Sequence, residues 1–343
     1  MSNRPWFNVE VTRGGMVESV HHAAACAVDP TGAVIFAAGD IDTPVFLRSS
    51  AKPFIAATVI AAGAQERFGL DEREIAVMAA SHAGQPFHVD AVRSILRKIG
   101  MQESDLLCGP HAPYNAAAAQ ELEQSGSVPG PVHNNCSGKH AGILALCKIL
   151  GADPATYLEP LNPAQQRILQ FCARISGMKL ADLRIGVDGC GIPVYAAPLR
   201  SSAAAFMHFA TLTGAEQHEV QAMQTVRSAM IAYPEYVAGT GEFDTRFMEA
   251  ANGIVACKSG AEGVQGAALL DSGVGLIVKV LDGASRGRGP AVLTILRRLG
   301  LVDGVTLTKL ADLEHPVVYN RAGRAVGEVR AAGVLAVRNV STG

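Results

Sequence analysis

Candidate β-strands stand at both ends of this 343-residue chain, and candidate helices fill its middle. Near the start, residues 18–28 and 33–38 read as two strands around the turn Asp29-Pro30-Thr31-Gly32. Near the end, further strands are expected over 253–256, 273–281, 317–319 and 325–330. Because helical periodicity dominates between them, the layout predicts an α/β (α+β) fold, with an antiparallel sheet built from both termini and a helical second lobe.

We expect the whole chain, 1–343, to form a single unit. Residues 1–50 and 250–343 would make up a sheet lobe with helices, and residues 51–249 a largely helical lobe. Hydrophobic residues account for 49% of the chain and charged residues for 17%, which permits a large buried core and argues against disorder.

The charge pattern excludes some kinds of partner. The net charge is -2 and no basic stripe occurs, so we expect no nucleic-acid partner. Residues 1–18 are polar and mixed, and no apolar run reaches the roughly 18 residues of a membrane-spanning helix. We therefore predict a cytoplasmic protein without a membrane partner, in which the seven cysteines stay reduced.

Lysine is scarce, which draws attention to where it occurs. Three of the eight lysines, Lys52, Lys139 and Lys258, lie in segments dense in Ser, Gly and Cys. A buried lysine can lose its proton, whereas arginine stays charged. These three lysines are therefore candidates for a chemical role.

Two short patterns indicate serine chemistry. Ser49 and Lys52 stand three residues apart, so on a helix they share one face, where a neutral lysine can take the proton of the hydroxyl. Lys258-Ser259-Gly260 follows later, and this order is typical of penicillin-binding proteins and class A β-lactamases. Taken singly, the first pattern is more often a capping serine with a solvated lysine, and the second a surface turn. Ser81 is a further candidate hydroxyl, which Lys258 could serve.

The segment Asn135-Cys136-Ser137-Gly138-Lys139-His140 precedes the apolar run 141–150, which should be a buried helix. Cys136 and Lys139, with Cys190 from the turn 188–193, could hold zinc. Zinc accepts thiolate sulfur readily, and a bound metal lowers the pKa of a lysine ligand. His133 or His140 would be more conventional ligands, and Cys136 could instead be a nucleophile.

These segments together resemble the Rhizobium-type L-asparaginase II family, the class 3 asparaginases, over nearly the whole chain. The resemblance rests on Arg48-Ser49-Ser50-Ala51-Lys52-Pro53, Ala80-Ser81-His82, Asn135 to His140, Asp188-Gly189-Cys190-Gly191-Ile192-Pro193 and Gly260-Ala261-Glu262-Gly263. It implies a fold similar to serine β-lactamases and glutaminases, a homodimer, and hydrolysis of L-asparagine to L-aspartate and ammonia. It also implies two serine-lysine pairs, Ser49 with Lys52 and Ser81 with Lys258, and zinc held by Cys136, Lys139 and Cys190.

On this reading Ser49 attacks the substrate amide with Lys52 as base, although the sequence does not decide between Ser49 and Ser81 as nucleophile. We expect four residues to bind the substrate, namely Arg48, Asp188, His140 and Asn135. The zinc would be structural or orienting. Three alternatives stay open: a glutaminase, a penicillin-recognising serine hydrolase, and a zinc-stabilised amino-acid-binding protein without activity.

Overall fold

The computed structural model describes residues 4–332 and divides the chain into two compact units. The first, which we call the sheet unit, comprises Met1–Ser50, Ala197–Thr211 and Arg246–Gly343. The second, the helical unit, comprises Ala51–Ala196 and Leu212–Thr245. The segment Ala197–Thr211, which lies within the range 51–249 expected to be largely helical, is grouped with the sheet unit.

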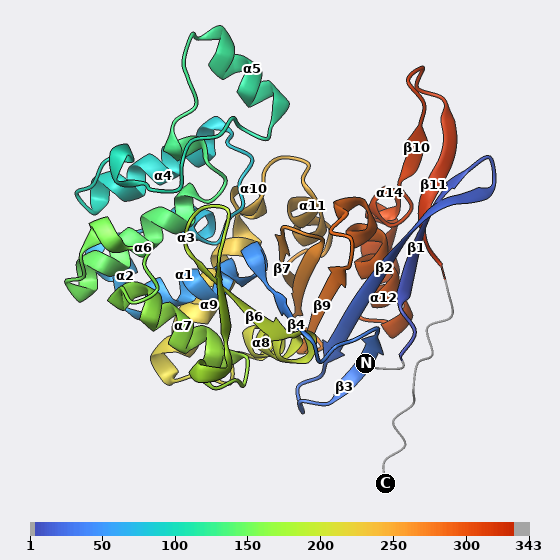
Figure 1. The fold of residues 1–343 in the computed structure, drawn as a ribbon, viewed down its shortest axis with the longest axis horizontal. Coiled ribbons are helices and arrows are strands. Elements are labelled where there is room, and N and C mark those ends of the chain that lie inside the picture. Colours follow the sequence, from blue (N-terminus) through green and yellow to red (C-terminus); the bar gives the residue numbers. More distant parts are fainter. Residues whose placement is uncertain (1–3, 333–343) are drawn as a thin grey trace. The chain divides into compact units, whose positions relative to one another are not determined.

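An antiparallel sheet in the order β10-β11-β1-β2-β9-β8-β7, with β3 paired to β2, forms the sheet unit (Figure 1). Because β1 pairs with β11 and β2 pairs with β9, the N-terminal strands lie between C-terminal strands in one sheet, which confirms the predicted arrangement. Its strands are β1 (Phe7–Arg13), β2 (Met16–Val28), β3 (Val34–Ala38), β7 (Val255–Gly260), β8 (Val264–Leu269), β9 (Val274–Val280), β10 (Val317–Tyr319) and β11 (Ala325–Ala332).

Helices cover the central strands of this sheet. All six residues of β8 and all but one of β9 are buried. Gly266 and Gly275 let helix α8 approach, since a Cβ at either position would collide with Phe206 or with the α8 backbone. Outside the sheet, this unit contains β4 (Pro44–Phe46), the 3-10 helix η1 (Arg48–Ala51), α8 (Leu199–Thr211), η6 (Ser285–Gly287), α12 (Arg288–Leu299), α13 (Gly304–Lys309) and α14 (Ala311–Glu314).

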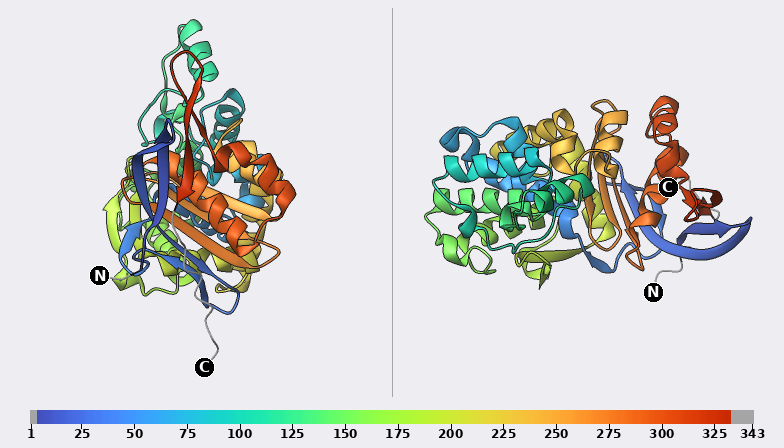
Figure 2. Two further views of the ribbon diagram at one scale, coloured as in Figure 1. Left: turned by 90° about the vertical axis from the view of Figure 1, so that its right-hand side faces the viewer. Right: turned by 90° about the horizontal axis from the view of Figure 1, so that it is seen from above.

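The helical unit is built around α1, whose first nine residues are all buried. Figure 2 gives two further views of its helices. They are α1 (Lys52–Ala61), α2 (Ala64–Phe68), α3 (Glu72–Met78), α4 (Pro86–Lys98), α5 (Ala116–Gln124), α6 (Ser137–Leu150), α7 (Pro163–Ile175), α9 (Gln217–Ala232) and α10 (Pro234–Val237). Short 3-10 helices occur at η2 (Glu103–Asp105), η3 (Pro131–His133), η4 (Pro154–Thr156) and η5 (Leu180–Asp182), and β5 (Arg184–Val187) pairs antiparallel with β6 (Pro193–Pro198). Three elements span a boundary between the units: α11 (Phe243–Ala250), η1, whose last residue is Ala51, and β6, whose last two residues are Ala197 and Pro198.

Two glycines set how closely α6 packs on α3. A Cβ on Gly138 would collide with the Val77 carbonyl, and one on Gly142 would approach the sulfur of Met78 to 2.8 Å. The first turn of α6 can therefore lie directly against the end of α3. This packing brings the Asn135–His140 segment next to the loop that follows α3.

None of the helices in residues 4–332 combines the length and the apolar character that a membrane span requires.

Candidate active site

The side chain of Lys52, the first residue of α1, is buried among acceptor groups and is only 1% exposed. Its Nζ donates to the Ala80 carbonyl at 2.6 Å and to Ser81 Oγ at 3.0 Å. Cys136 Sγ lies 3.2 Å away and the Asn135 carbonyl 3.5 Å away. A lysine so placed is linked to one hydroxyl and one thiol at once.

Ser81 lies just after α3, in a loop held at both ends. Its backbone N–H donates to the Val237 carbonyl at 3.0 Å, and the next N–H, of His82, donates to the Asn135 carbonyl at 3.2 Å. Because His82 Nδ1 accepts from the Gly84 N–H, its Nε2 donates to Ser137 Oγ at 2.8 Å. His82 is fully buried and satisfied, so its role is to hold the Ser81 loop against α6.

Cys136, Lys139 and Cys190 come together in the helical unit, as the sequence suggested. Lys139 Nζ lies 2.9 Å from Cys190 Sγ, and both cysteines and the lysine are at most 5% exposed. Cys136 and Lys139 are three residues apart at the start of α6, while Cys190 sits in the turn before β6. The tight turn is closed by Gly191, which adopts a φ of 91°.

The charges in this cluster are interdependent. A hydrogen bond from Cys190 and the nearby Lys139 and Lys52 hold the pKa of Cys136 well below its ordinary value. The same hydrogen bond, with burial, raises the pKa of Cys190. Burial lowers the pKa of Lys52, whereas the sulfurs of Cys136 and Cys190 outweigh burial and raise the pKa of Lys139. Of the two lysines, Lys52 is therefore the better candidate for a base.

The other candidate serine, Ser49, lies in the sheet unit. It is half-buried in η1, directly after Arg48, whose φ of 52° is rare for a residue other than glycine. Its neighbour Ser50 donates to the Leu47 carbonyl at 2.6 Å and is therefore structural.

Strand β7 brings the Lys258-Ser259-Gly260 segment to the same turn within the sheet unit. A Cβ on Gly260 would lie 2.8 Å from the Leu47 carbonyl and 3.2 Å from the Ser50 nitrogen, so only glycine fits without displacement. Lys258 is fully buried, and its Nζ donates to the Ser259 carbonyl at 2.8 Å. The two patterns that suggested serine chemistry thus meet at one backbone contact.

The candidate substrate ligands have different surroundings. Asp188 is half-buried, and its Oδ1 accepts from the Gly189 N–H at 2.8 Å. His140 is fully buried, with Nδ1 2.6 Å from the Tyr157 hydroxyl, and within residues 4–332 its Nε2 has no hydrogen-bond partner. The backbone N–H of Asn135 donates to His111 Nε2 at 2.9 Å. Neither His111 nor Tyr157 was singled out from the sequence, where nothing marked them beyond their residue types.

The structure adds a pairing that spacing along the chain did not suggest. Ser49 and Lys52 were paired by their three-residue separation, and Ser81 was assigned to Lys258. The geometry adds a hydrogen bond between Lys52 and Ser81, 29 positions apart in the chain. Lys52 is therefore a partner for Ser81 as well as a candidate partner for Ser49.

A sequence model of L-asparaginase II matches residues 9–331, nearly the whole chain. The chain belongs to the L-asparaginase II family. Family membership makes the chain an amidohydrolase that acts on a small-molecule amide. No protein with a curated description matches its sequence.

Solved structures similar to this asparaginase II chain are remote in sequence. A crystal structure of Mglu shares 16% identity, covers 82% of this chain and 68% of that chain, and has a TM-score of 0.37. A provisionally assigned β-lactamase from Bacteroides dorei DSM 17855 shares 16% identity, covers 80% of this chain and 93% of that chain, and has a TM-score of 0.42.

The cluster in the asparaginase II chain offers donors that suit zinc. Two buried sulfurs and one amine converge, and zinc binds thiolate strongly. Within residues 4–332, no three His, Cys, Asp or Glu side chains are grouped for a metal, so the third protein ligand would have to be Lys139. Binding would require Lys139 to lose the proton that the two sulfurs now stabilise.

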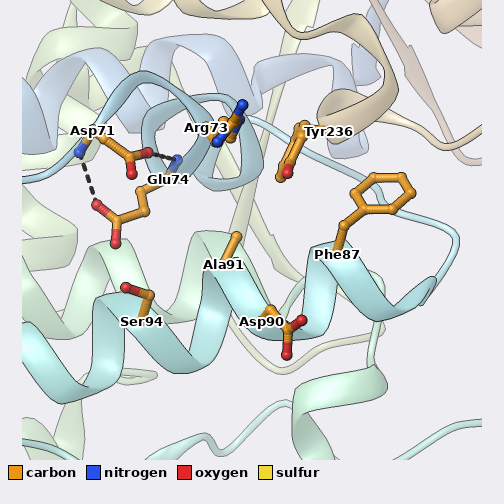
Figure 3. Close-up of a pocket in the computed structure, with 8 residues that line it drawn as sticks. All are labelled: Asp71, Arg73, Glu74, Phe87, Asp90, Ala91, Ser94 and Tyr236. Atoms are coloured by element: carbon orange, nitrogen blue, oxygen red, sulfur yellow. Dashed lines mark hydrogen bonds between the residues drawn. The ribbon is translucent and has the colours of Figure 1, made fainter.

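A pocket of about 240 Å³ in the helical unit is lined by none of these residues. Figure 3 shows the residues that line it. Its polar groups already serve the fold: Asp71 and Glu74 form a reciprocal cap at the start of α3, and Glu74 also pairs with Lys98 at 2.6 Å. Ser94 on α4 lines this cavity and provides a serine outside the candidate site for comparison experiments.

Proposed function

We propose that the chain hydrolyses L-asparagine to L-aspartate and ammonia through a serine acyl-enzyme activated by Lys52. Membership of the L-asparaginase II family supports the substrate. The observation that carries the mechanism is the fully buried Lys52 Nζ, 3.0 Å from Ser81 Oγ. Burial lowers the pKa of Lys52, which favours the neutral amine that a general base requires.

In the proposed first step, Ser49 Oγ attacks the side-chain amide carbon and gives its proton to Lys52 Nζ. Backbone N–H groups near Ser49 would stabilise the tetrahedral oxyanion. The proton then passes from Lys52 through Ser81 Oγ to the amide nitrogen, the C–N bond breaks, and ammonia leaves. The product of this step is a β-aspartyl ester on Ser49.

In the second step, water attacks the ester carbon, and Ser49 recovers its proton as aspartate leaves. We assign the activation of this water to Lys52 or to Ser81 assisted by Lys258. Ser81 is thus a proton relay in this scheme, and its hydrogen bond to Lys52 supports that role.

Substrate binding is assigned to four residues. Arg48 would bind the α-carboxylate and Asp188 the α-ammonium, because their charges are complementary to those groups. Asn135 and His140 would contact the remainder of the substrate. The buried Nε2 of His140, without a partner in residues 4–332, is compatible with a ligand contact.

We further propose that Cys136, Lys139 and Cys190 bind zinc. A bound zinc would supply positive charge and fix the positions of its ligands. Because Cys136 also contacts Lys52 Nζ at 3.2 Å, the proposed ligand set is connected to the proposed base. The homodimer and the cytoplasmic location remain predictions from the resemblance and from the sequence.

Release of ammonia from L-asparagine and from L-glutamine tests this function, with the colour change of a chromogenic β-lactam as a control for lactam hydrolysis. We expect asparagine to be preferred over glutamine by roughly 10–200-fold, since the two substrates differ by one methylene. We expect no β-lactam hydrolysis. Binding of asparagine without ammonia release would support the binding-protein alternative, and a preference for glutamine would support the glutaminase.

A further inference from the structure

The loop 108–115 holds both segments that contact Lys52. On one side, the Asn115 N–H donates to the Ala83 carbonyl at 2.9 Å, which ties the loop to the Ser81 turn. On the other, Asn134 Nδ2 donates to the carbonyls of Cys108 and Gly109, both at 2.9 Å. The loop therefore bridges the two sets of acceptors around the Lys52 ammonium.

His111 makes the most specific of these contacts. Its Nδ1 donates to the Ala112 carbonyl at 2.8 Å, which leaves Nε2 as an acceptor for the Asn135 N–H at 2.9 Å. The ring is also stacked on Tyr114, with centroids 4.8 Å apart and planes 28° apart. Hydrogen bond and stacking together define the orientation of the imidazole.

The peptide that His111 holds is the one that contacts Lys52. The Asn135 carbonyl lies 3.5 Å from Lys52 Nζ and accepts the His82 N–H at 3.2 Å. Cys136, the next residue, contacts Lys52 Nζ through Sγ, and its N–H donates to Asn134 Oδ1 at 2.9 Å. A shift of this segment would alter two of the four groups around the ammonium.

We propose that His111 is a positioning residue for the Lys52 site: by accepting the Asn135 N–H it holds the Asn135 carbonyl and the Cys136 sulfur against the lysine. It acts through Asn135 and has no contact with reacting atoms in this scheme. The expected effect of His111 on the rate of asparagine hydrolysis rests on the proposed function. The geometric part, that His111 holds the 134–136 segment, stands independently of the substrate.

Comparison of His111→Ala with His111→Gln tests the proposal. Glutamine can accept the Asn135 N–H through Oε1 and donate through Nε2, whereas alanine can do neither. We expect His111→Ala to lower kcat for asparagine on the order of 10–100-fold with little change in KM. The reason is that the groups that position Lys52, the proposed base, would be displaced while the substrate still binds. His111→Gln should recover most of that loss, and the exposed His218→Ala should match the wild type.

Amide hydrogen exchange supplies a readout that does not depend on activity. Exchange across residues 134–137 should be faster in His111→Ala and close to wild type in His111→Gln, while the melting temperature changes little. If the wild type releases no ammonia from asparagine, the proposed function fails and the exchange data alone decide the role of His111. Unchanged exchange in His111→Ala, or failure of glutamine to restore both exchange and kcat, overturns the proposal.

Discussion

Lys52 Nζ donates a hydrogen bond to Ser81 Oγ at 3.0 Å, and the same nitrogen lies 3.2 Å from Cys136 Sγ. One buried ammonium thus connects a candidate proton relay to the candidate zinc ligands. A substitution of Lys52, Ser81 or Cys136 should therefore alter the surroundings of the other two residues.

Replacing Lys52 by methionine removes the proposed base and keeps a long apolar side chain. We expect kcat/KM for asparagine to fall by about 10²–10⁴-fold, which is the usual contribution of general-base catalysis. Lys148→Met is the matched control, because Lys148 is exposed on α6. Steady-state kinetics of the two variants check the prediction, and a Lys52→Met enzyme with wild-type activity would contradict a lysine base.

Gly138→Ala tests how closely α6 must approach α3. The added Cβ would meet the Val77 carbonyl, so the start of α6 has to move and carry Cys136 and Lys139 with it. Overpacking of this kind costs about 1–3 kcal/mol in the free energy of unfolding. Urea unfolding should show that loss together with reduced activity, whereas Gly304→Ala, where a Cβ meets nothing within 4 Å, should show neither.

Acid should destabilise the fold through His88. Its Nε2 donates to the Glu235 carbonyl at 2.8 Å and its Nδ1 accepts from the Gln85 N–H, so both nitrogens of the neutral ring are hydrogen-bonded. Burial lowers the pKa of His88 from 6.5 to about 4. Between these values the unfolded chain binds the extra proton, so this contribution to stability is present above pH 6.5 and is lost as the pH falls towards 4. The total contribution of His88 to the free energy of unfolding that is lost in this way is on the order of 3 kcal/mol.

The measurement is urea unfolding at several pH values for wild type, His88→Gln and the exposed control His218→Gln. Stability relative to wild type should improve for His88→Gln as the pH falls from 6.5 to 4, because that variant no longer takes up the proton. Parallel pH profiles for wild type and His88→Gln would show that His88 titrates normally.

Zinc content provides a separate test of the cysteine–lysine cluster. Purified wild type should contain about one zinc per chain, and Cys190→Ala should lose it, because each protein ligand contributes a large share of the affinity. Cys147→Ala changes a buried cysteine on α6 outside the cluster and should retain the metal. Elemental analysis after dialysis checks this prediction. Wild type that contains no zinc and keeps its full turnover would contradict the proposed zinc site.

Much of the sheet unit could be predicted from local pattern. The strand expected over 18–28 is β2, and the strand expected over 273–281 is β9. Strand β1 was missed because its polar residues hid the alternation of Phe7, Val9 and Val11, all of which are buried. Strand β8 was missed because VQGAAL has weak β-propensity, and pairing with strands on both sides decides its structure.

In the candidate site, too, contacts between residues close in sequence could be predicted, whereas contacts between distant segments could not. The three-residue spacing of Ser49 and Lys52 is visible in the sequence, as is the proximity of Cys136 to Lys139. The Lys52–Ser81 hydrogen bond depends on α6 packing against α3, and no spacing along the chain indicates it. His111 was missed for the same reason, since its partner Asn135 lies 24 positions away.

The most direct test of the central claim is ammonia release from L-asparagine by wild type, Ser49→Ala, Ser81→Ala and the control Ser94→Ala, followed by intact-protein mass spectrometry of rapidly quenched samples. Wild type and Ser94→Ala should release ammonia and carry a β-aspartyl adduct. Ser49→Ala should show neither, and Ser81→Ala should release ammonia slowly. Full ammonia release by Ser49→Ala, or an adduct that persists in it, would contradict Ser49 as the nucleophile.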